Sequence, residues 1–223
     1  MRDSFSGWPG TTLWAWERPE NLQFIDAGQT AVAFLASTVT LSDSATSVRP
    51  RMQPLRVAAH ARLMAVVRVE ARNAALTAEQ REAVVNAAVA ASHLPRVSAV
   101  QIDFDATASQ RRFYRESLEG LRLRLPRTPI SITALASWCM DDDWIGGLPV
   151  DEAVPMLFRM GRDDRSIRAQ LKSGDDFREP LCRTSVGLST DEPPAMTPGA
   201  RRTYWFAPRS WTQAALRSAE VMR

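Results

Sequence analysis

Lysine, histidine and cysteine are scarce in this chain of 223 residues, which has one lysine, Lys172, two histidines and two cysteines. His60 and His93 each precede a predicted strand, so we expect both at the amino-terminal ends of strands, away from the face where α/β barrels hold their ligands. This argues against a Ser-His or Cys-His nucleophile pair and against a histidine-rich zinc or iron site. A magnesium or calcium site built from carboxylates stays open, but we predict no metal ion and no cofactor.

Long apolar runs are also absent. No segment approaches the ~18 apolar residues of a membrane span, so we predict none. Residues 1–10 lack the apolar centre of a secretion signal. Two localisations stay open: a cytoplasmic protein, or a mature domain whose leader has been removed.

The basic residues are scattered along the chain. The net charge is +3, and the only adjacent basic pairs are Arg111–Arg112 and Arg201–Arg202. A nucleic-acid surface gathers basic side chains on one face, usually beside aromatic residues. We therefore predict no nucleic-acid partner. Apolar residues make up 45% of the chain and charged residues 24%, which is typical of a soluble globular protein.

Short apolar runs recur along the chain, bounded by Pro, Gly, Asp or Ser, and have the length and composition of strands. The eight runs are Leu13–Trp16, Ala31–Ala36, Leu63–Val69, Val97–Phe104, Ile130–Leu135, Ala153–Met160, Thr184–Leu188 and Thr203–Phe206.

Helical patterns lie between several of these runs. They cover Thr77–Ser92, Ala108–Leu125, Asp163–Lys172 and Trp211–Met222. Strands that alternate with helices indicate parallel pairing, and eight of them predict one compact, somewhat irregular (β/α)8 barrel domain over residues 1–223. The alternative is an open doubly wound sheet, although the chain has no glycine-rich phosphate loop.

Two connections depart from the barrel pattern. Residues 37–60 are long and hold Thr38–Leu41, which we interpret as part of a hairpin in place of a helix. Asp191–Arg202 is rich in proline, and we predict a loop there.

Alternation along the predicted strands gathers polar side chains on one side. Gln101, Asp103 and Asp105 alternate with apolar residues and would face into the barrel at the carboxyl end of the fourth strand. By the same rule Arg68 and Glu70 face inward from the third strand, and Thr133 from the fifth. Buried carboxylates are costly unless paired. The cluster is thus either an active site or an internal ion-pair network, for example between Arg68 and Asp103.

Further candidates lie at strand ends, where barrels place their functional residues. The arrangement of carboxylates beside tryptophans that can stack on a sugar ring suggests general acid chemistry on a glycosidic bond. Asp141–Asp143 is interpreted as a solvated helix start. The strand-end candidates are Glu17 and Arg18 after the first strand, Trp138 after the fifth, Arg159 after the sixth, Asp191 and Glu192 after the seventh, and Trp205 in the eighth.

Residues 100–105, Val-Gln-Ile-Asp-Phe-Asp, resemble the fourth-strand motif D-x-x-D-x-D-x-E of chitinase-type family-18 glycoside hydrolases. In that register Asp103 matches the last aspartate, Asp105 takes the place of the catalytic glutamate, and Gln101 replaces an aspartate. The resemblance implies Asp105 as the acid and Asp103 as its orienting partner. Where that family brings a Tyr-Asp pair on the sixth strand, this chain has Phe158-Arg159.

A second resemblance covers nearly the whole chain and points to an uncharacterised bacterial family, domain-of-unknown-function family 3142. It is carried by Trp16–Pro19, Gln101–Ala106, Ser131–Cys139, Val150–Glu152 with Phe158–Gly161, and Gly187–Pro193.

Cys139 and Cys182 lie 43 residues apart and are either two buried thiols or a disulfide. Many members of the second family look exported, which implies the disulfide and a periplasmic or extracellular location.

Two functions follow as alternatives. The first is a glycoside-hydrolase-like barrel that acts on or binds a saccharide. In it Asp105 is the acid, Asp103 its modulator, Glu17, Glu70 or Glu192 the opposing carboxylate, and Trp138 and Trp205 the sugar platforms; Arg18 and Arg159 orient the ligand. The second is a non-catalytic binding or scaffold protein on a degenerate barrel, with the carboxylates held in ion pairs and the mouth plugged. An open cavity that includes Asp105 distinguishes the first from the second.

Overall fold

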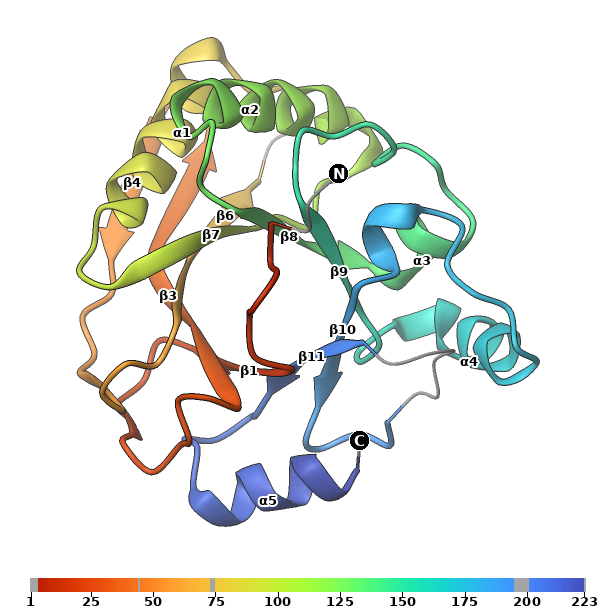
Figure 1. Ribbon diagram of the computed structural model, residues 1–223. Coiled ribbons are helices and arrows are strands. Elements are labelled where there is room, and N and C mark those ends of the chain that lie inside the picture. Colours follow the sequence, from red (N-terminus) through yellow and green to blue (C-terminus); the bar gives the residue numbers. More distant parts are fainter. Residues whose placement is uncertain (1–3, 44, 73–74, 195–200, 223) are drawn as a thin grey trace.

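A computed structural model describes residues 4–43, 45–72, 75–194 and 201–222. Within them, eight parallel strands close into a barrel, because β1 pairs with both β3 and β11 (Figure 1). The predicted (β/α)8 barrel is confirmed, and the open doubly wound alternative is wrong. The barrel strands are β1 (Thr11–Ala15), β3 (Thr30–Ser42), β6 (Leu63–Ala71), β7 (Val97–Asp103), β8 (Ile130–Leu135), β9 (Glu152–Met156), β10 (Ser185–Ser189) and β11 (Arg202–Phe206).

Helices cover part of the outside of the barrel (Figure 1). The four predicted helices are confirmed, with ends that differ by a few residues; Thr77 caps the first by accepting a hydrogen bond from the Gln80 backbone N–H. A further helix, α3 (Ala136–Met140), is too short for its periodicity to show in the sequence. The four are α1 (Ala78–Ser92), α2 (Arg111–Arg124), α4 (Asp164–Lys172) and α5 (Gln213–Val221), and 3₁₀ turns cover Ala108–Gln110, Gly161–Asp163 and Pro180–Cys182.

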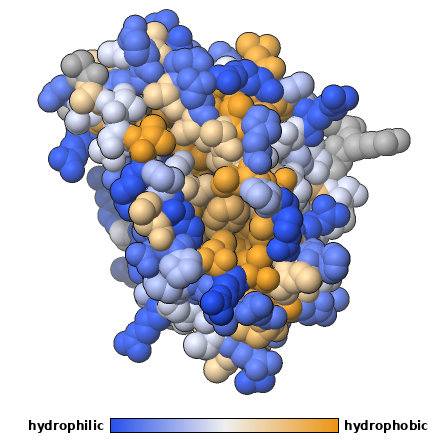
Figure 2. Space-filling view, turned by 90° about the vertical axis from the view of Figure 1, so that its left-hand side faces the viewer, coloured by the Kyte–Doolittle hydropathy of each residue, from blue (hydrophilic) through white to orange (hydrophobic). Residues whose placement is uncertain are grey.

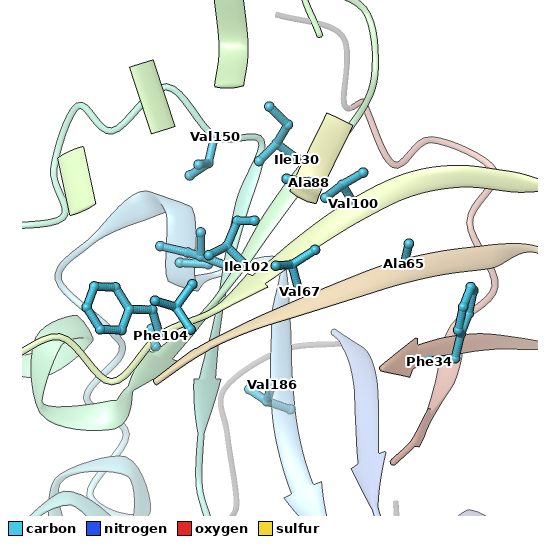
Figure 3. Close-up of a cluster of buried hydrophobic side chains, with 14 of the residues drawn as sticks. Phe34, Ala65, Val67, Ala88, Val100, Ile102, Phe104, Ile130, Val150 and Val186 are labelled. Carbon is cyan, nitrogen blue, oxygen red and sulfur yellow. The ribbon is translucent and has the colours of Figure 1, made fainter. Parts of the chain in front are cut away.

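Alternation along the strands divides the core into two parts. Side chains that point outward pack under the helices, as Val67, Val100 and Ile102 do around Ala88 of α1 (Figure 3). Side chains that point inward fill the barrel with a smaller cluster, which includes Trp14, Met64, Val66, Ala99, Val154 and Tyr204. The barrel interior is therefore packed rather than hollow, and space for a ligand is left only near its mouth.

The connection after β3 replaces a helix with strands. β3 continues past the barrel and turns into the antiparallel strand β4 (Ala45–Pro50), so the expected hairpin is present. A register shift between Leu35 and Ser37 exchanges the two faces of β3: Phe34 points outward before it, and Val39 after it. Two short strands, β2 (Glu20–Leu22) and β5 (Leu55–Val57), pair beside the barrel. Figure 2 shows this side of the molecule, where apolar side chains form a band between hydrophilic margins.

Two local predictions need correction. The sixth strand ends at Met156 and not at Met160, and Arg159, three residues further on, has a positive φ of 53° that is incompatible with a strand. Asp141–Asp143 follow helix α3 and do not start one. Residues 195–200 of the predicted loop at Asp191–Arg202 lie outside the described residues.

No helix among the residues that the structure describes has the length and apolarity needed to span a bilayer.

Candidate functional site

A cavity of about 290 Å³ opens at the carboxyl ends of the barrel strands, the face on which barrels of this kind place their sites. Six strands and the loops that follow them contribute to it. Its lining residues are Trp14, Trp16, Arg68, Asp103, Asp105, Thr133, Leu135, Ala136, Ser137, Met156, Phe158, Arg159, Met160, Asp163, Ile167 and Phe206.

The two aspartates come from the end of β7, where alternation turns both toward the cavity. Asp103 is the last residue of the strand and is buried; its Oδ1 accepts a hydrogen bond of 2.7 Å from the Thr133 hydroxyl of β8. Asp105 lies two residues further on and is exposed at the cavity mouth. The Arg68 guanidinium lies 3.6 Å from Oδ2 of Asp103 and 3.1 Å from the Glu70 carboxylate.

Burial dominates the acidity of this pair. It raises the pKa of Asp103 from 3.8 to about 6, against the opposing effect of the Thr133 hydrogen bond, and the nearby Asp105 charge raises it further. Burial also raises the pKa of Asp105, and the Arg68 charge partly offsets that increase. The pair therefore holds a proton at a higher pH than an exposed aspartate, as a general acid requires.

We expect Asp103→Asn to remove a pH dependence of stability. A carboxyl with a raised folded-state pKa contributes most below pH 4, and that contribution is lost as the pH rises through about 6. The shift from 3.8 to about 6, which already includes the attraction to Arg68, corresponds to about 3 kcal/mol of unfolding free energy. In urea denaturation between pH 3 and pH 8, the free energy of unfolding of the variant should increase relative to that of the wild type as the pH rises. Asp141→Asn, which changes an exposed aspartate, is the control; parallel curves for wild type and Asp103→Asn would contradict the expectation.

Aromatic rings form one part of the cavity wall. Phe158 and Phe206 stack with centroids 5.7 Å apart and planes 7° apart, and Trp16 meets Phe206 edge to face at 6.4 Å. Two guanidinium groups cover this wall: Arg68 lies 5.8 Å from the centre of Trp16, and Arg159 lies 4.8 Å from the centre of Phe206. Trp14, Trp16 and Phe206 were not among the predicted site residues, although the alternation that places the aspartates on the cavity side applies to them as well.

The two tryptophans predicted as sugar platforms do not reach the cavity, and that prediction is wrong. Trp205 points outward from β11 and is 1% exposed, because its neighbours Tyr204 and Phe206 take the inward positions. Trp138 in α3 is 4% exposed and packs edge to face on Trp144, with centroids 4.9 Å apart.

Glu17 and Arg18 do not line the cavity, so the roles predicted for them there are wrong. Their side chains bind other segments. The Glu17 carboxylate accepts hydrogen bonds from the backbone N–H groups of Met52 and Gln53, at 3.0 and 3.1 Å. Arg18 donates to Glu20 at 2.7 Å and to the Ala207 carbonyl at 2.6 Å. Both residues tie the loop after β1 to neighbouring segments.

Arg159 lines the cavity as predicted for a strand-end residue, and two acidic residues hold its loop. Glu192 accepts from the Arg159 backbone N–H at 3.1 Å, and the Asp191 carboxylate lies 3.7 Å from the Arg159 guanidinium. Asp191 also accepts from the Ser189 hydroxyl, and Glu192 lies 3.7 Å from Arg168. Asp191 and Glu192 therefore position Arg159.

A second, smaller cavity of about 170 Å³ lies on the other side of the aspartate pair. It shares Arg68, Asp103 and Asp105 with the first cavity and is completed by Glu70 and its neighbours Val69, Ala71 and Phe104. The aspartates therefore stand between two spaces, one aromatic and one more polar.

Cys139 and Cys182 form a disulfide that joins α3 to the 3₁₀ turn before β10, with Cα atoms 6.0 Å apart. Both residues are fully buried. Among the residues that the structure describes, no group of three or more His, Cys, Asp or Glu side chains is arranged to hold a metal ion.

Comparison with known proteins supports the fold. The catalytic domain of a family GH18 chitinase from the fern Peteris ryukyuensis superposes with a TM-score of 0.56 and 9% sequence identity, covering 95% of this chain and 98% of the chitinase chain. No family model matches the sequence, and no curated protein matches it. The chain is thus a barrel similar in fold to a chitinase catalytic domain.

Proposed function

We propose that this protein is a glycoside-hydrolase-like barrel that binds a carbohydrate in the aromatic cavity and cleaves a glycosidic bond, with Asp105 as the general acid. The observation that carries the proposal is the juxtaposition of an aspartate pair of raised pKa with a wall of stacked aromatic rings in one open cavity. Sugar rings present apolar faces that pack on such walls, and their hydroxyls suit the charged groups around them.

The division of roles follows from exposure. Asp105 lies at the mouth and is the member of the pair that can reach a glycosidic oxygen. Its carboxyl donates a proton to that oxygen as the bond to the anomeric carbon breaks, and water supplies the hydroxyl that this carbon gains. Asp103 accepts a hydrogen bond from Thr133, which holds its carboxyl group in place beside that of Asp105. Glu17, Glu70 and Glu192 do not line the aromatic cavity, so we assign none of them the role of the opposing carboxylate.

The fold comparison adds independent support, since a chitinase catalytic domain uses the same barrel architecture. The alternative, a non-catalytic binding protein, is favoured by one observation: Arg68 contacts both Asp103 and Glu70, as in an internal ion-pair network. The cavity nevertheless contains Asp105 and opens to solvent, which favours a ligand site over a plugged mouth.

The first test is a panel of oligosaccharides and polysaccharides, assayed for thermal shifts and for new reducing ends. We expect one class to bind, and Phe206→Ala to weaken that binding about tenfold, because the variant removes half of the stacked pair. Leu123→Ala, which changes an exposed leucine of α2, is the control. Binding without cleavage would favour the non-catalytic alternative, and the absence of both across the panel would contradict the proposal.

We also propose that the protein works in an oxidising compartment, periplasmic or extracellular. The buried disulfide supports this, because such bonds are uncommon in reducing cytosol. Fractionation of cells that express the full natural gene, followed by immunodetection, tests it; protein confined to the cytosol would contradict it.

A further inference from the structure

Trp14 of β1 lies where the packed barrel interior meets the ligand cavity. Its side chain is 3% exposed, and it lines the cavity together with Phe158, whose ring centre is 6.2 Å away. Its indole Nε1 donates a hydrogen bond of 2.8 Å to Oε1 of Gln101 in β7. Gln101 has no exposed surface, and its Nε2 donates to the Ser131 hydroxyl of β8 at 3.0 Å.

The chain of contacts continues across the barrel. Ser131 hydrogen-bonds the Tyr204 hydroxyl of β11. Tyr204 donates in turn to Glu152 of β9, and Glu152 accepts from the Arg202 guanidinium at 2.8 Å. Side chains from five strands are thus connected, and Gln101, Ser131, Tyr204 and Glu152 are all fully buried.

The donors in this series of hydrogen bonds all point from Trp14 toward Glu152. An indole N–H can only donate, and a carboxylate paired with arginine accepts. The groups between these two ends must therefore each accept from the tryptophan side and donate toward Glu152. A glutamine side chain meets that requirement because it carries one acceptor and one donor. A carboxylate at position 101 would accept from Trp14 but would have nothing to donate to Ser131.

Packing restricts the indole from its other side. A Cβ atom added to Gly187 of β10 would lie 2.9 Å from Cη2 of Trp14 and 3.4 Å from the Met156 Cα. The ring also lies 5.4 Å from Tyr204, centre to centre. The absence of a side chain at Gly187 leaves the space that the indole fills, and the bond to Gln101 fixes the direction in which Nε1 points.

We propose that Gln101 is a positioning residue that orients Trp14 as the floor of the ligand cavity, through a one-directional chain of hydrogen bonds anchored at the buried Glu152–Arg202 pair. That this orientation of Trp14 serves a ligand rests on the proposed function, whereas the role of Gln101 in setting the orientation is independent of it.

Hydrogen exchange of the Trp14 indole N–H, followed by NMR and assigned with Trp14→Phe, tests the structural part. In Gln101→Leu we expect exchange to become at least about tenfold faster, since the indole loses its acceptor inside the barrel. Gln101→Glu should keep an exchange rate within a few-fold of the wild type measured at the same pH, because the introduced side chain accepts from the indole N–H whether or not it is protonated. Gln53→Leu, at an exposed glutamine, is the control.

The ligand part uses hexasaccharides of glucose, N-acetylglucosamine and xylose as probes, titrated by calorimetry. If the wild type binds one of them, Gln101→Leu should raise its Kd about tenfold, and Gln101→Glu, which keeps the acceptor for Trp14, should bind more tightly than Gln101→Leu. Indole exchange at the wild-type rate in Gln101→Leu overturns the proposal, as does faster exchange with an unchanged Kd. If Gln101→Leu does not fold, Gln101→Met, which keeps the length of the side chain and removes its amide, carries both measurements. Failure of the wild type to bind any probe counts against the proposed function, while the exchange data still decide the role of Gln101.

Discussion

Replacing Asp105 with asparagine should lower the rate of glycosidic cleavage by about 10²–10⁴-fold, the usual contribution of a general acid. Asparagine has nearly the same shape but carries no transferable proton. Asp105 is exposed at the mouth, so the substitution leaves the buried packing unchanged, and we expect substrate affinity to stay within a few-fold of the wild type.

The pH profile separates this role from a structural one. Wild-type activity should fall as the pH rises through the range in which the pair loses its proton, because both aspartates have raised pKa values and that of Asp103 is about 6. The residual activity of Asp105→Asn should not show this decrease with rising pH. Asp141→Asn, which changes an exposed aspartate outside the cavity, is the matched control. Wild-type rates in Asp105→Asn would rule out its role as the acid.

Loss of the disulfide should destabilise the protein by about 4 kcal/mol. The bond joins residues 43 positions apart, and closing a loop of that size restricts the unfolded chain by roughly this amount. The effect should be uniform with pH, in contrast to that of Asp103, since disulfide cysteines do not titrate.

The measurement compares urea denaturation of the wild type with Cys139→Ala/Cys182→Ala. Alanine is preferred to serine because both positions are fully buried, and an unpaired hydroxyl there would add its own cost. Thiol titration of the unfolded wild type should detect no free thiol before reduction and two after it. Equal denaturation midpoints, or two free thiols without reduction, would contradict the assignment.

The polar cluster at the barrel mouth was predictable where alternation along a strand alone determines which side chains face inward. Alternation along β7 placed Asp103 and Asp105 on the cavity side, and the same rule on β8 placed Thr133 beside Asp103. The aromatic residues were chosen by type instead, which selected Trp138 and Trp205 and passed over Trp16 and Phe206.

Loop residues were less predictable than strand residues. Glu17, Asp191 and Glu192 lie beyond the strand ends, where no periodicity constrains the backbone. Their carboxylates bind backbone N–H groups or side chains of other segments. Only the path of those segments determines whether such a carboxylate faces a ligand or holds a loop.

The sequence by itself determined the succession of strands and helices that parallel pairing requires, because the period-2 and period-3.6 patterns and the helix caps are local properties of the chain. It also determined which residues of β7 face inward. The tertiary structure alone decided the closure through β1, the exchange of faces at the β3 register shift, and the one-directional contact chain from Trp14 to Glu152. These features depend on pairings between residues up to about two hundred positions apart, and no local pattern encodes which strand becomes the neighbour of another.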